Sequence, residues 1–312
     1  MSDEQNENDS GWQERRKRQR FVAQRDGTTC FWVVMDGQKR PLNDLSLEGF
    51  GFPGEASEGE RREFDFELPV GYTDEDGQVH RIASLRKMTG HEEALLADRK
   101  LRQNAARLVT QLLAACVKRI GEIAPVPRNV ISELTSPDRN FLLLQLRRIT
   151  FGDAIEATYV CPSCGESTRI THDLDEVPVR RLNGEGRRDV VVELADGWES
   201  TGGDYYTSMV FRLPTGVDEE RISPLTRENA SLGMNALLTR CLVALGDMPN
   251  DRREALGTKV LTDLTMGDRA AIDRAFRQDM PGLDLTRSVV CDTCGRTFRT
   301  TIDLTGFFSV QQ

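Results

Sequence analysis

The chain has 312 residues, of which 38% are hydrophobic and 29% charged, and its formal net charge is −9 at pH 7. This balance predicts a soluble globular protein, and the acidic excess argues against nucleic acid as a partner because phosphate contacts need clustered Lys and Arg. The sequence has no run of eighteen apolar residues and no apolar signal-peptide core at its start. We therefore expect no membrane span and a cytoplasmic location.

The first sixty residues predict a β-rich extension. Residues 1–13 are polar and typical of a disordered tail, and residues 14–61 form the extension and its linker. The predicted order is a basic cluster (15–20), a strand in "TTCFWVV" (28–34), a turn in "MDGQKR" (35–40), a strand in "LNDLSLEGFGF" (42–52) and the linker "PGEASEGERR" (53–62).

Two short motifs in this extension resemble those of the PilZ domain, a small β-barrel that binds cyclic di-GMP. They are Arg16-x-x-x-Arg20 and Asp44-x-Ser46-x-x-Gly49. The resemblance implies that these five residues bind the nucleotide, and guanidinium forks suit phosphate and guanine edges. The extension is short for a complete barrel of this kind. The alternative is a basic tail followed by a two-strand hairpin.

After the extension, strands and amphipathic helices alternate in a pattern typical of an α+β fold. A capping box at Thr89 and Glu92 begins an apolar helical stripe that we expect to run to Gly121. A second helix is predicted to start at Ser136-Pro137 with Ser136 as its cap. The other predicted elements are strands at 62–72, 154–160 and 208–216, and helices at about 227–245 and 268–279.

This order of elements repeats along the chain. The segment from Leu134 to Leu174 aligns without a gap to the segment that begins at Leu264, at an offset of 130 residues. Farther upstream, Cys116 and Gly121 match residues at an offset of 125, and Leu68-Pro69-x-Gly71 matches Leu213-Pro214-x-Gly216 at 145. The sequence thus predicts a duplicated unit of strand, LPxG turn, two helices and a β-hairpin, over residues 62–185 and 186–312.

Each predicted repeat ends in one Cys-x-x-Cys pair. The pairs are Cys161 with Cys164 and Cys291 with Cys294. One pair gives two thiolates, and a structural zinc ion takes four in a tetrahedron, so we expect the two halves to share one zinc ion per chain. The alternative is a redox pair, although such pairs usually open a helix and here strands flank both. A Cys291→Ser change is expected to lose zinc and separate the halves.

The remaining polar and cysteine residues do not predict an enzyme. Only three histidines are present, and the sequence has no nucleophile elbow, P-loop or dinucleotide fingerprint. "YTDEDGQ" (72–78) is interpreted as a solvated turn, and His172 as a hairpin residue. Cys116 and Cys241 are expected in the core, and Cys30 is expected to be buried or to have no functional role. Asp138-Arg139 and Asp268-Arg269 are interpreted as helix caps or salt bridges between repeats.

Several of these motifs together resemble the T4-type phage baseplate protein family. They are "FDFELPVGYTDEDGQVHR", "LRKMTGHEEALLADRK", "LLLQLRRITFGD", "CPSCG" and "CDTCG…IDLTGFF", within about residues 62–308. The resemblance implies a non-enzymatic structural or assembly component of a contractile phage tail or a tail-like injection particle, which binds other tail or baseplate proteins. The alternative is a zinc-ribbon module that binds nucleic acid or acts in regulation, with cyclic di-GMP as its signal.

Overall fold

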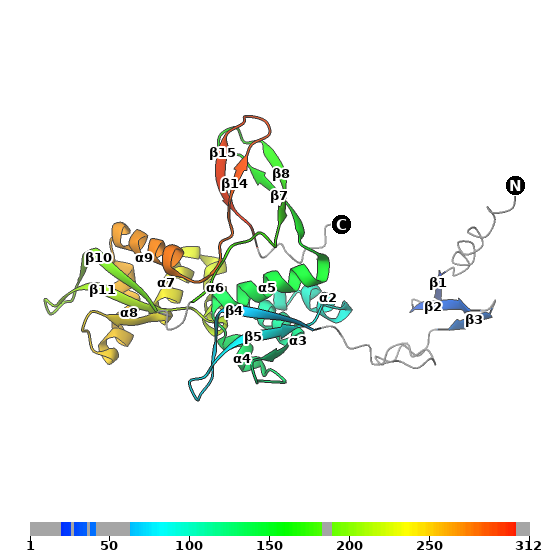
Figure 1. Ribbon diagram of the computed structural model, residues 1–312, viewed down its shortest axis with the longest axis horizontal. Coiled ribbons are helices and arrows are strands. Elements are labelled where there is room, and N and C mark those ends of the chain that lie inside the picture. The colour runs from blue at the N-terminus through cyan, green and yellow to red at the C-terminus, as the bar shows by residue number, and fades with distance from the viewer. Residues whose placement is uncertain (1–19, 26–27, 36–37, 42–62, 183–188, 304–312) are drawn as a thin grey trace, which may run out of the picture. The chain divides into compact units, whose positions relative to one another are not determined.

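The computed structural model describes residues 20–25, 28–35, 38–41, 63–182 and 189–303. The chain divides into two compact units, Met1–Gly59 and Glu60–Gln312 (Figure 1). No helix in the described residues is long and apolar enough to cross a membrane.

The smaller unit holds a three-stranded antiparallel sheet in the order β1-β2-β3. Its strands are β1 (Arg20–Arg25), β2 (Thr28–Met35) and β3 (Gln38–Pro41). The strand predicted in "TTCFWVV" is therefore confirmed. The turn predicted at 35–40 is wrong at both ends, because β2 reaches Met35 and β3 begins at Gln38. The predicted strand at 42–52 lies outside the described residues.

The larger unit begins with a first half, residues 63–182, built on a three-stranded antiparallel sheet in the order β4-β5-β6. Helices cover this sheet, and a hairpin follows them. The elements are β4 (Phe64–Thr73), β5 (Val79–Leu85), α2 (Gly90–Ala97), the 3₁₀ turn η2 (Leu101–Gln103), α3 (Ala105–Cys116), β6 (Val117–Ile120), α4 (Arg128–Glu133), α5 (Ser136–Phe151), β7 (Ala154–Val160), β8 (Ser167–Asp173) and β9 (Val179–Arg180).

The second half, residues 189–303, has the same order of main elements. Its antiparallel sheet has the order β10-β11-β12, and a second hairpin closes it. The elements are β10 (Asp189–Glu199), β11 (Tyr205–Arg212), α6 (Gly216–Glu228), α7 (Ala230–Cys241), β12 (Leu242–Leu245), α8 (Asn250–Asp263), α9 (Met266–Asp279), β13 (Gly282–Leu283), β14 (Thr286–Val290) and β15 (Thr297–Thr301). The fold is mixed α and β, as predicted.

The long helix predicted at 89–121 is wrong, because it is broken at Asn104. The helix predicted at about 227–245 is present but shorter, because α7 begins after Asn229 and residues 242–245 form β12. The capping box of Thr89 and Glu92 does start α2. However, the side chain of Asn104 accepts a hydrogen bond from Arg107 N and starts a new helix there, and Asn229 does the same for α7. Both new helices end at a cysteine, and a short strand follows. The strand predicted at 208–216 ends at Arg212.

The predicted equivalence of the two LPxG motifs is also wrong. Leu68–Gly71 lies inside β4, whereas residues 213–215 connect β11 to α6 and Gly216 is the first residue of α6. Both β4 and β10 contain a register shift, and it ends in a glycine with positive φ, Gly71 (89°) or Gly197 (67°). The structural counterpart of Leu68–Gly71 is therefore Leu194–Gly197, at an offset of 126. The proline is not shared, so matching the motif by its letters selected the wrong segment.

A buried aspartate holds each of these irregular strands. Asp138, in the first turn of α5, accepts hydrogen bonds from Val70 N (2.8 Å) and Gly71 N (3.1 Å). Asp268, in the first turn of α9, accepts from Ala195 N (2.7 Å) and Gly197 N (3.0 Å). Both carboxylates have no exposed surface. The caps of these helices are Thr135 and Thr265, so the predicted cap at Ser136 is one residue late.

Each half has its own hydrophobic core, and the halves also touch directly. Cys116 and Cys241 lie in the two cores, as predicted, and burial raises the pKa of each thiol to about 12. Between the halves, α6 packs against α3 and α4. Arg139 Nε forms the predicted inter-repeat ion pair, with Glu219 Oε2 at 3.2 Å. The hairpins are thus one of several connections between the halves.

Candidate metal centre

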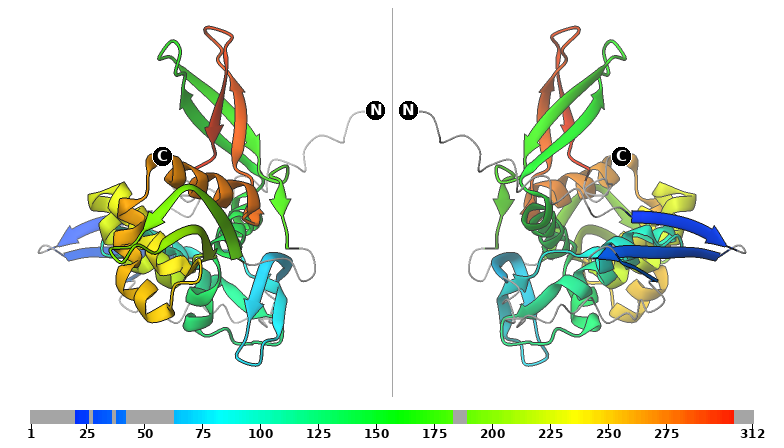
Figure 2. Two further views of the ribbon diagram at one scale, coloured as in Figure 1. Left: turned by 90° about the vertical axis from the view of Figure 1, so that its left-hand side faces the viewer. Right: turned by 90° about the vertical axis from the view of Figure 1, so that its right-hand side faces the viewer.

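Two β-hairpins, one from each half of the larger unit, project side by side (Figure 2). In the first, β7 pairs with β8 from Ala154↔Asp173 to Val160↔Ser167. In the second, β14 pairs with β15 from Thr286↔Thr301 to Val290↔Thr297. In both, the first cysteine follows the last paired residue directly. The register of strand pairing therefore places each Cys-x-x-Cys pair in the turn at the tip of its hairpin.

The two tips have the same backbone geometry. Cys161 N donates to Glu166 O and Gly165 N donates to Cys161 O, both at 2.9 Å. In the second hairpin, Cys291 N donates to Arg296 O at 3.0 Å and Gly295 N donates to Cys291 O at 2.9 Å. Gly165 and Gly295 have φ of 77° and 68°, which favours glycine at both places. The repeated glycine is thus explained by the turn that aims the sulfurs.

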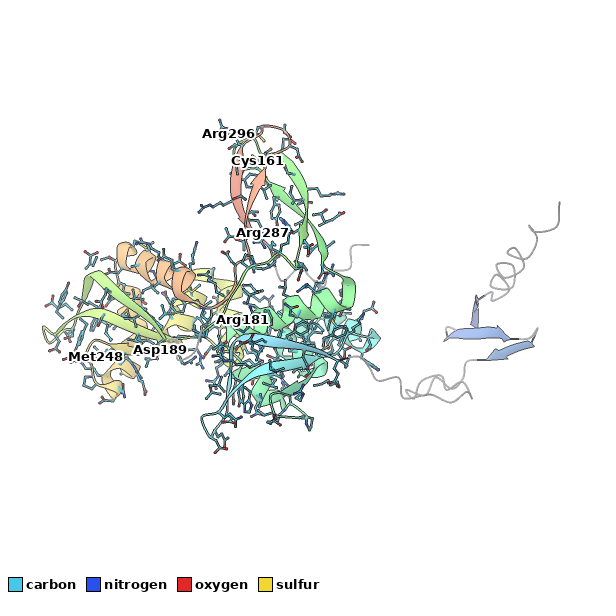
Figure 3. The ribbon with its side chains drawn as sticks, viewed as in Figure 1. Cys161, Arg181, Asp189, Met248, Arg287 and Arg296 are labelled. Carbon is cyan, nitrogen blue, oxygen red and sulfur yellow. The ribbon has the colours of Figure 1, made fainter. Side chains whose placement is uncertain are left out.

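The four sulfur atoms converge across the two hairpins. Cys161 Sγ lies 3.7 Å from Cys294 Sγ, and Cys164 Sγ lies 3.6 Å from Cys291 Sγ. All four lie within 4.8 Å of one another. Sulfurs bound at about 2.3 Å to a tetrahedral zinc ion are about 3.8 Å apart, so the cluster has the dimensions of such a site. Figure 3 shows Cys161 at the hairpin tip.

Backbone N–H groups favour thiolates at two of these cysteines. The N–H groups of Cys164 and then Ser163 lower the pKa of Cys161. The N–H of Cys294 is the main cause that lowers the pKa of Cys291 to about 6. For Cys164, the N–H of Glu166 acts in the same direction, but partial desolvation and the neighbouring sulfurs outweigh it and raise the pKa to about 12. Four thiolates at this spacing need a cation to neutralise their repulsion.

Contacts between the hairpins hold the tips in place. Asp292 N donates to Thr168 Oγ1 at 3.3 Å, and Thr168 is fully buried. Arg296 Nη1 donates to Ser163 Oγ at 3.4 Å. Sequence analysis did not identify Thr168 or Ser163, because the residues at an offset of 130 are Phe298 and Thr293. Thr168 and Ser163 each occur in the first hairpin only, so a comparison of the two repeats does not reveal these contacts.

The base of the two hairpins has a small apolar cluster of its own. Leu174 and Ile302, just beyond the ends of β8 and β15, are buried together with Leu144 and Val177. Leu144 belongs to α5, so the cluster fixes the hairpins to the body of the first half. The hairpins are thus held by contacts near the cysteines at their tips and by this apolar cluster at their base.

Other predicted residues fall outside this centre. His172 lies in β8, as predicted, and its Nε2 is 2.9 Å from the Tyr159 hydroxyl. His80 lies 2.8 Å from Asp74 in the turn predicted at 72–78. Within the described ranges, the four cysteines form the one group of three or more His, Cys, Asp or Glu side chains close enough to hold a metal ion.

The nucleotide motif of the extension stays a prediction. Arg20 is the first residue of β1, but its side chain is outside the described part of the chain. Arg16, Asp44, Ser46 and Gly49 also lie outside the described residues. The structure therefore does not test the resemblance to PilZ domains.

Comparison with known proteins gives one family for the larger unit. A family model described as T4 bacteriophage base plate protein matches residues 62–310. The match includes both halves and both hairpins. No curated protein and no solved structure matches the chain.

Proposed function

We propose, because the chain belongs to the family of T4 bacteriophage base plate proteins, that it is a non-enzymatic component of a contractile phage tail or a tail-like injection system. In this proposal it builds the baseplate or assists its assembly by binding other tail proteins. The single observation that carries the proposal is the family match over residues 62–310, which takes in the larger unit almost completely.

We further propose that Cys161, Cys164, Cys291 and Cys294 hold one structural zinc ion. The sulfur spacing of 3.6 and 3.7 Å supports a tetrahedral four-sulfur site. A complete set of protein ligands leaves no position for a water molecule, so the ion would stabilise structure rather than catalyse a reaction. Strands flank both pairs, which argues against the redox alternative.

We also propose that the two halves arose as an internal duplication. Three devices occur in both at matching places, which supports this proposal. They are the aspartate that accepts hydrogen bonds from the irregular strand, the capping box at α2 or α6, and an arginine that forms a bidentate ion pair with the acid of that box. For the third device, Arg86 binds Glu92 with bonds of 2.7 and 3.0 Å, and Arg212 binds Asp218 with bonds of 2.6 and 3.0 Å. In this proposal the first repeat unit spans residues 62–185 and the second spans residues 186–312.

Purified tail-like particles from the native host test the proposed function. Particles and lysate are blotted for this protein, and particle assembly is compared with that of a deletion strain. If the protein is in the particle and its loss blocks assembly, it is a structural component. If it is absent from the particle but assembly still needs it, it is an assembly factor. Normal particles without the protein would overturn the proposal and favour the regulatory alternative.

A further inference from the structure

The first turns of α5 and α9 carry an equivalent arginine in different surroundings. Arg139 and Arg269 are 130 residues apart, as are the flanking segments. Arg139 Nη1 donates to Ile131 O at 3.1 Å, and Arg269 Nη1 donates to Leu261 O at 2.8 Å. Each guanidinium is therefore fixed to its own half in the same way. What covers it differs between the halves.

In the first half, α6 covers this position. Arg139 is 1% exposed, and its Nε binds Glu219 Oε2. The Ser136 hydroxyl donates to Glu219 Oε1, and the Thr110 hydroxyl donates to Glu220 Oε1, both at 2.5 Å. The acidic first turns of α6 thus form hydrogen bonds with side chains of both α3 and α5. The surface around Arg139 thus binds a helix that has acidic side chains in its first turns.

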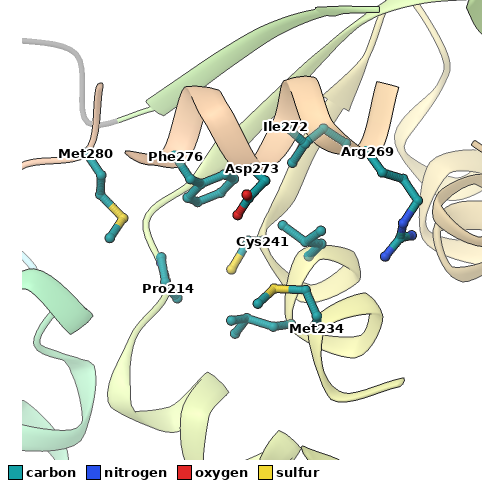
Figure 4. Close-up of a pocket in the computed structure, with 10 residues that line it drawn as sticks. Pro214, Met234, Cys241, Arg269, Ile272, Asp273, Phe276 and Met280 are labelled. Carbon is teal, nitrogen blue, oxygen red and sulfur yellow. The ribbon is translucent and has the colours of Figure 1, made fainter. Parts of the chain in front are cut away.

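In the second half, the equivalent surface is an open groove of about 390 Å³ between α7 and α9 (Figure 4). Its lining is mainly apolar, and Arg269 and Asp273 lie at its polar rim. The apolar side chains are Pro214, Met234, Leu237, Leu238, Ile272, Phe276 and Met280. Figure 4 shows Ile272 and Phe276 extending from α9 toward Met234 on α7. Met234 is 49% exposed.

Arg269 lines this groove, and Asn235 and Met266, which lie outside its lining, also stand at positions that α6 contacts in the first half. Among the described residues, Arg269 has no ion-pair partner, whereas Arg139 has Glu219. Asn235, at the position of Thr110, has a buried Oδ1 without a hydrogen-bond partner in the same part of the chain. Met266 is 79% exposed at the position of Ser136, which is 5% exposed. The groove therefore presents both an unpaired cation and exposed apolar surface.

We propose that this groove docks an amphipathic helix of a partner baseplate protein, with an acidic side chain in its first turns that pairs with Arg269. The occupant has the chemistry of α6, because α6 occupies the equivalent surface of the first half. Its apolar face covers Met234 and Phe276. The identity of the partner as a baseplate protein rests on the proposed function, whereas the shape and charge of the groove do not.

Among the residues that the structure describes, a second copy of the chain offers no free helix that matches α6 in length and charge. Its α6 is used on its own first half. The equivalent helix, α2, has only eight residues and keeps one acid, the exposed Glu93, at the position of Glu219. Ala94 stands where α6 has Glu220. The shorter α2 with its single acid is a poorer match to the groove than α6, so we assign the helix to another protein.

A synthetic peptide of residues 214–229, which contains α6, provides a direct probe. Fluorescence anisotropy of the labelled peptide is measured against the full chain. We expect saturable binding, and at least a fivefold weaker affinity for the Arg269→Gln chain and for a peptide with Glu219→Gln and Glu220→Gln. Arg274→Gln is the control, because it makes the same charge change on α9 at an exposed residue that does not line the groove.

The outcomes separate the groove from other binding sites. No saturable binding overturns the proposal. Binding that Arg269→Gln leaves unchanged overturns it too, because the peptide has then displaced α6 from the first half or bound elsewhere. Self-association of the chain that Arg269→Gln abolishes would replace the partner helix by a second copy.

Complementation of the deletion strain distinguishes failure of this inference from failure of the proposed function. We expect the chain with Arg269→Gln and Met234→Gln to restore fewer particles than the Arg274→Gln chain. If both chains restore assembly equally, the docking groove is wrong and the baseplate function stands. If the strain makes normal particles without any copy, the baseplate function is wrong.

Discussion

The two halves of the larger unit use equivalent residues in different environments. In the first half, Arg139 is buried beneath α6 and paired with Glu219. In the second half, Arg269 lies at the rim of an open groove. The side chain and its bond to a backbone carbonyl are shared, so the difference comes from the helix that packs above it. A repeated residue therefore fixes local geometry, whereas packing decides burial and charge partners.

The two hairpins resemble each other more closely than the helical bodies of the two halves do. Both tips have the same turn, the same glycine and the same backbone hydrogen bonds. A four-sulfur site needs two thiolates from each hairpin in one geometry, so neither tip can change alone. The helical bodies have no such shared constraint, and α6 is longer than its counterpart α2. Substitutions in the hairpin tips and at equivalent positions of the two bodies test this contrast.

Loss of one thiol should have the largest effect. With Cys291→Ser, we expect bound zinc to fall from one ion per chain to almost none, because three thiolates bind the ion far more weakly than four. Metal content is measured by elemental analysis, and the hairpins by amide hydrogen exchange. Because α6 also joins the halves, we expect protection to be lost in β7, β8, β14 and β15 while the two cores stay protected.

The control for this experiment is Ser163→Ala, which removes a hydroxyl from the same tip and leaves all four sulfurs. It should keep its zinc. If Cys291→Ser kept its zinc and its hairpin protection, the shared site would be wrong. Loss of protection throughout both cores would instead show that the ion holds the halves together.

Substitution of the two equivalent arginines should sharpen the contrast between the halves. We expect Arg139→Met to lower the free energy of unfolding by about 3 kcal/mol, because it removes a buried ion pair and bonds to the carbonyls of Ile131 and Ala106. Arg269→Met should cost less than about 1 kcal/mol, since its side chain is partly exposed. Urea unfolding measures both. Equal costs would contradict the different environments.

The two buried aspartates should behave alike. Asp138→Asn and Asp268→Asn each turn one carboxylate oxygen into an N–H donor that faces a backbone N–H of the irregular strand. We expect a loss of about 2 kcal/mol in each case, from a lost hydrogen bond and an unsatisfied donor. Urea unfolding of both variants is the measurement. A large cost in one half alone would show that only that strand depends on its aspartate.

The sequence predicted the parts of the fold that local signals control. The strands before the cysteines, the helix that begins near Ser136 and the pairing of the two Cys-x-x-Cys motifs all have strong short-range patterns. The break at Asn104 was missed because the apolar stripe continues past it. The helices α4, α6 and α8 and the strand β10 were not predicted. The groove at Arg269 could not be predicted, since it depends on where α6 packs.

Acid should reveal a smaller, shared contribution of the two capping boxes. Burial alone would raise the pKa of Glu92, but Arg86 and Thr89 outweigh it and lower the pKa to about 2. Burial is likewise outweighed at Asp218, mainly by Arg212, and its pKa is also lowered. A carboxylate with a lowered pKa stabilises the folded state above its unfolded pKa, and this stability is lost as the pH falls.

The Glu92→Gln variant measures this contribution. It should be about 1–2 kcal/mol less stable than the parent near neutral pH, less than the full pKa shift implies, because the amide keeps hydrogen bonds to Thr89. The difference should shrink as the pH falls from about 4.5 towards 2, the range between the unfolded and folded pKa values of Glu92. Asp218→Asn should show the same trend in the second half. A difference that stays constant with pH would mean that Glu92 contributes through packing and not through its charge.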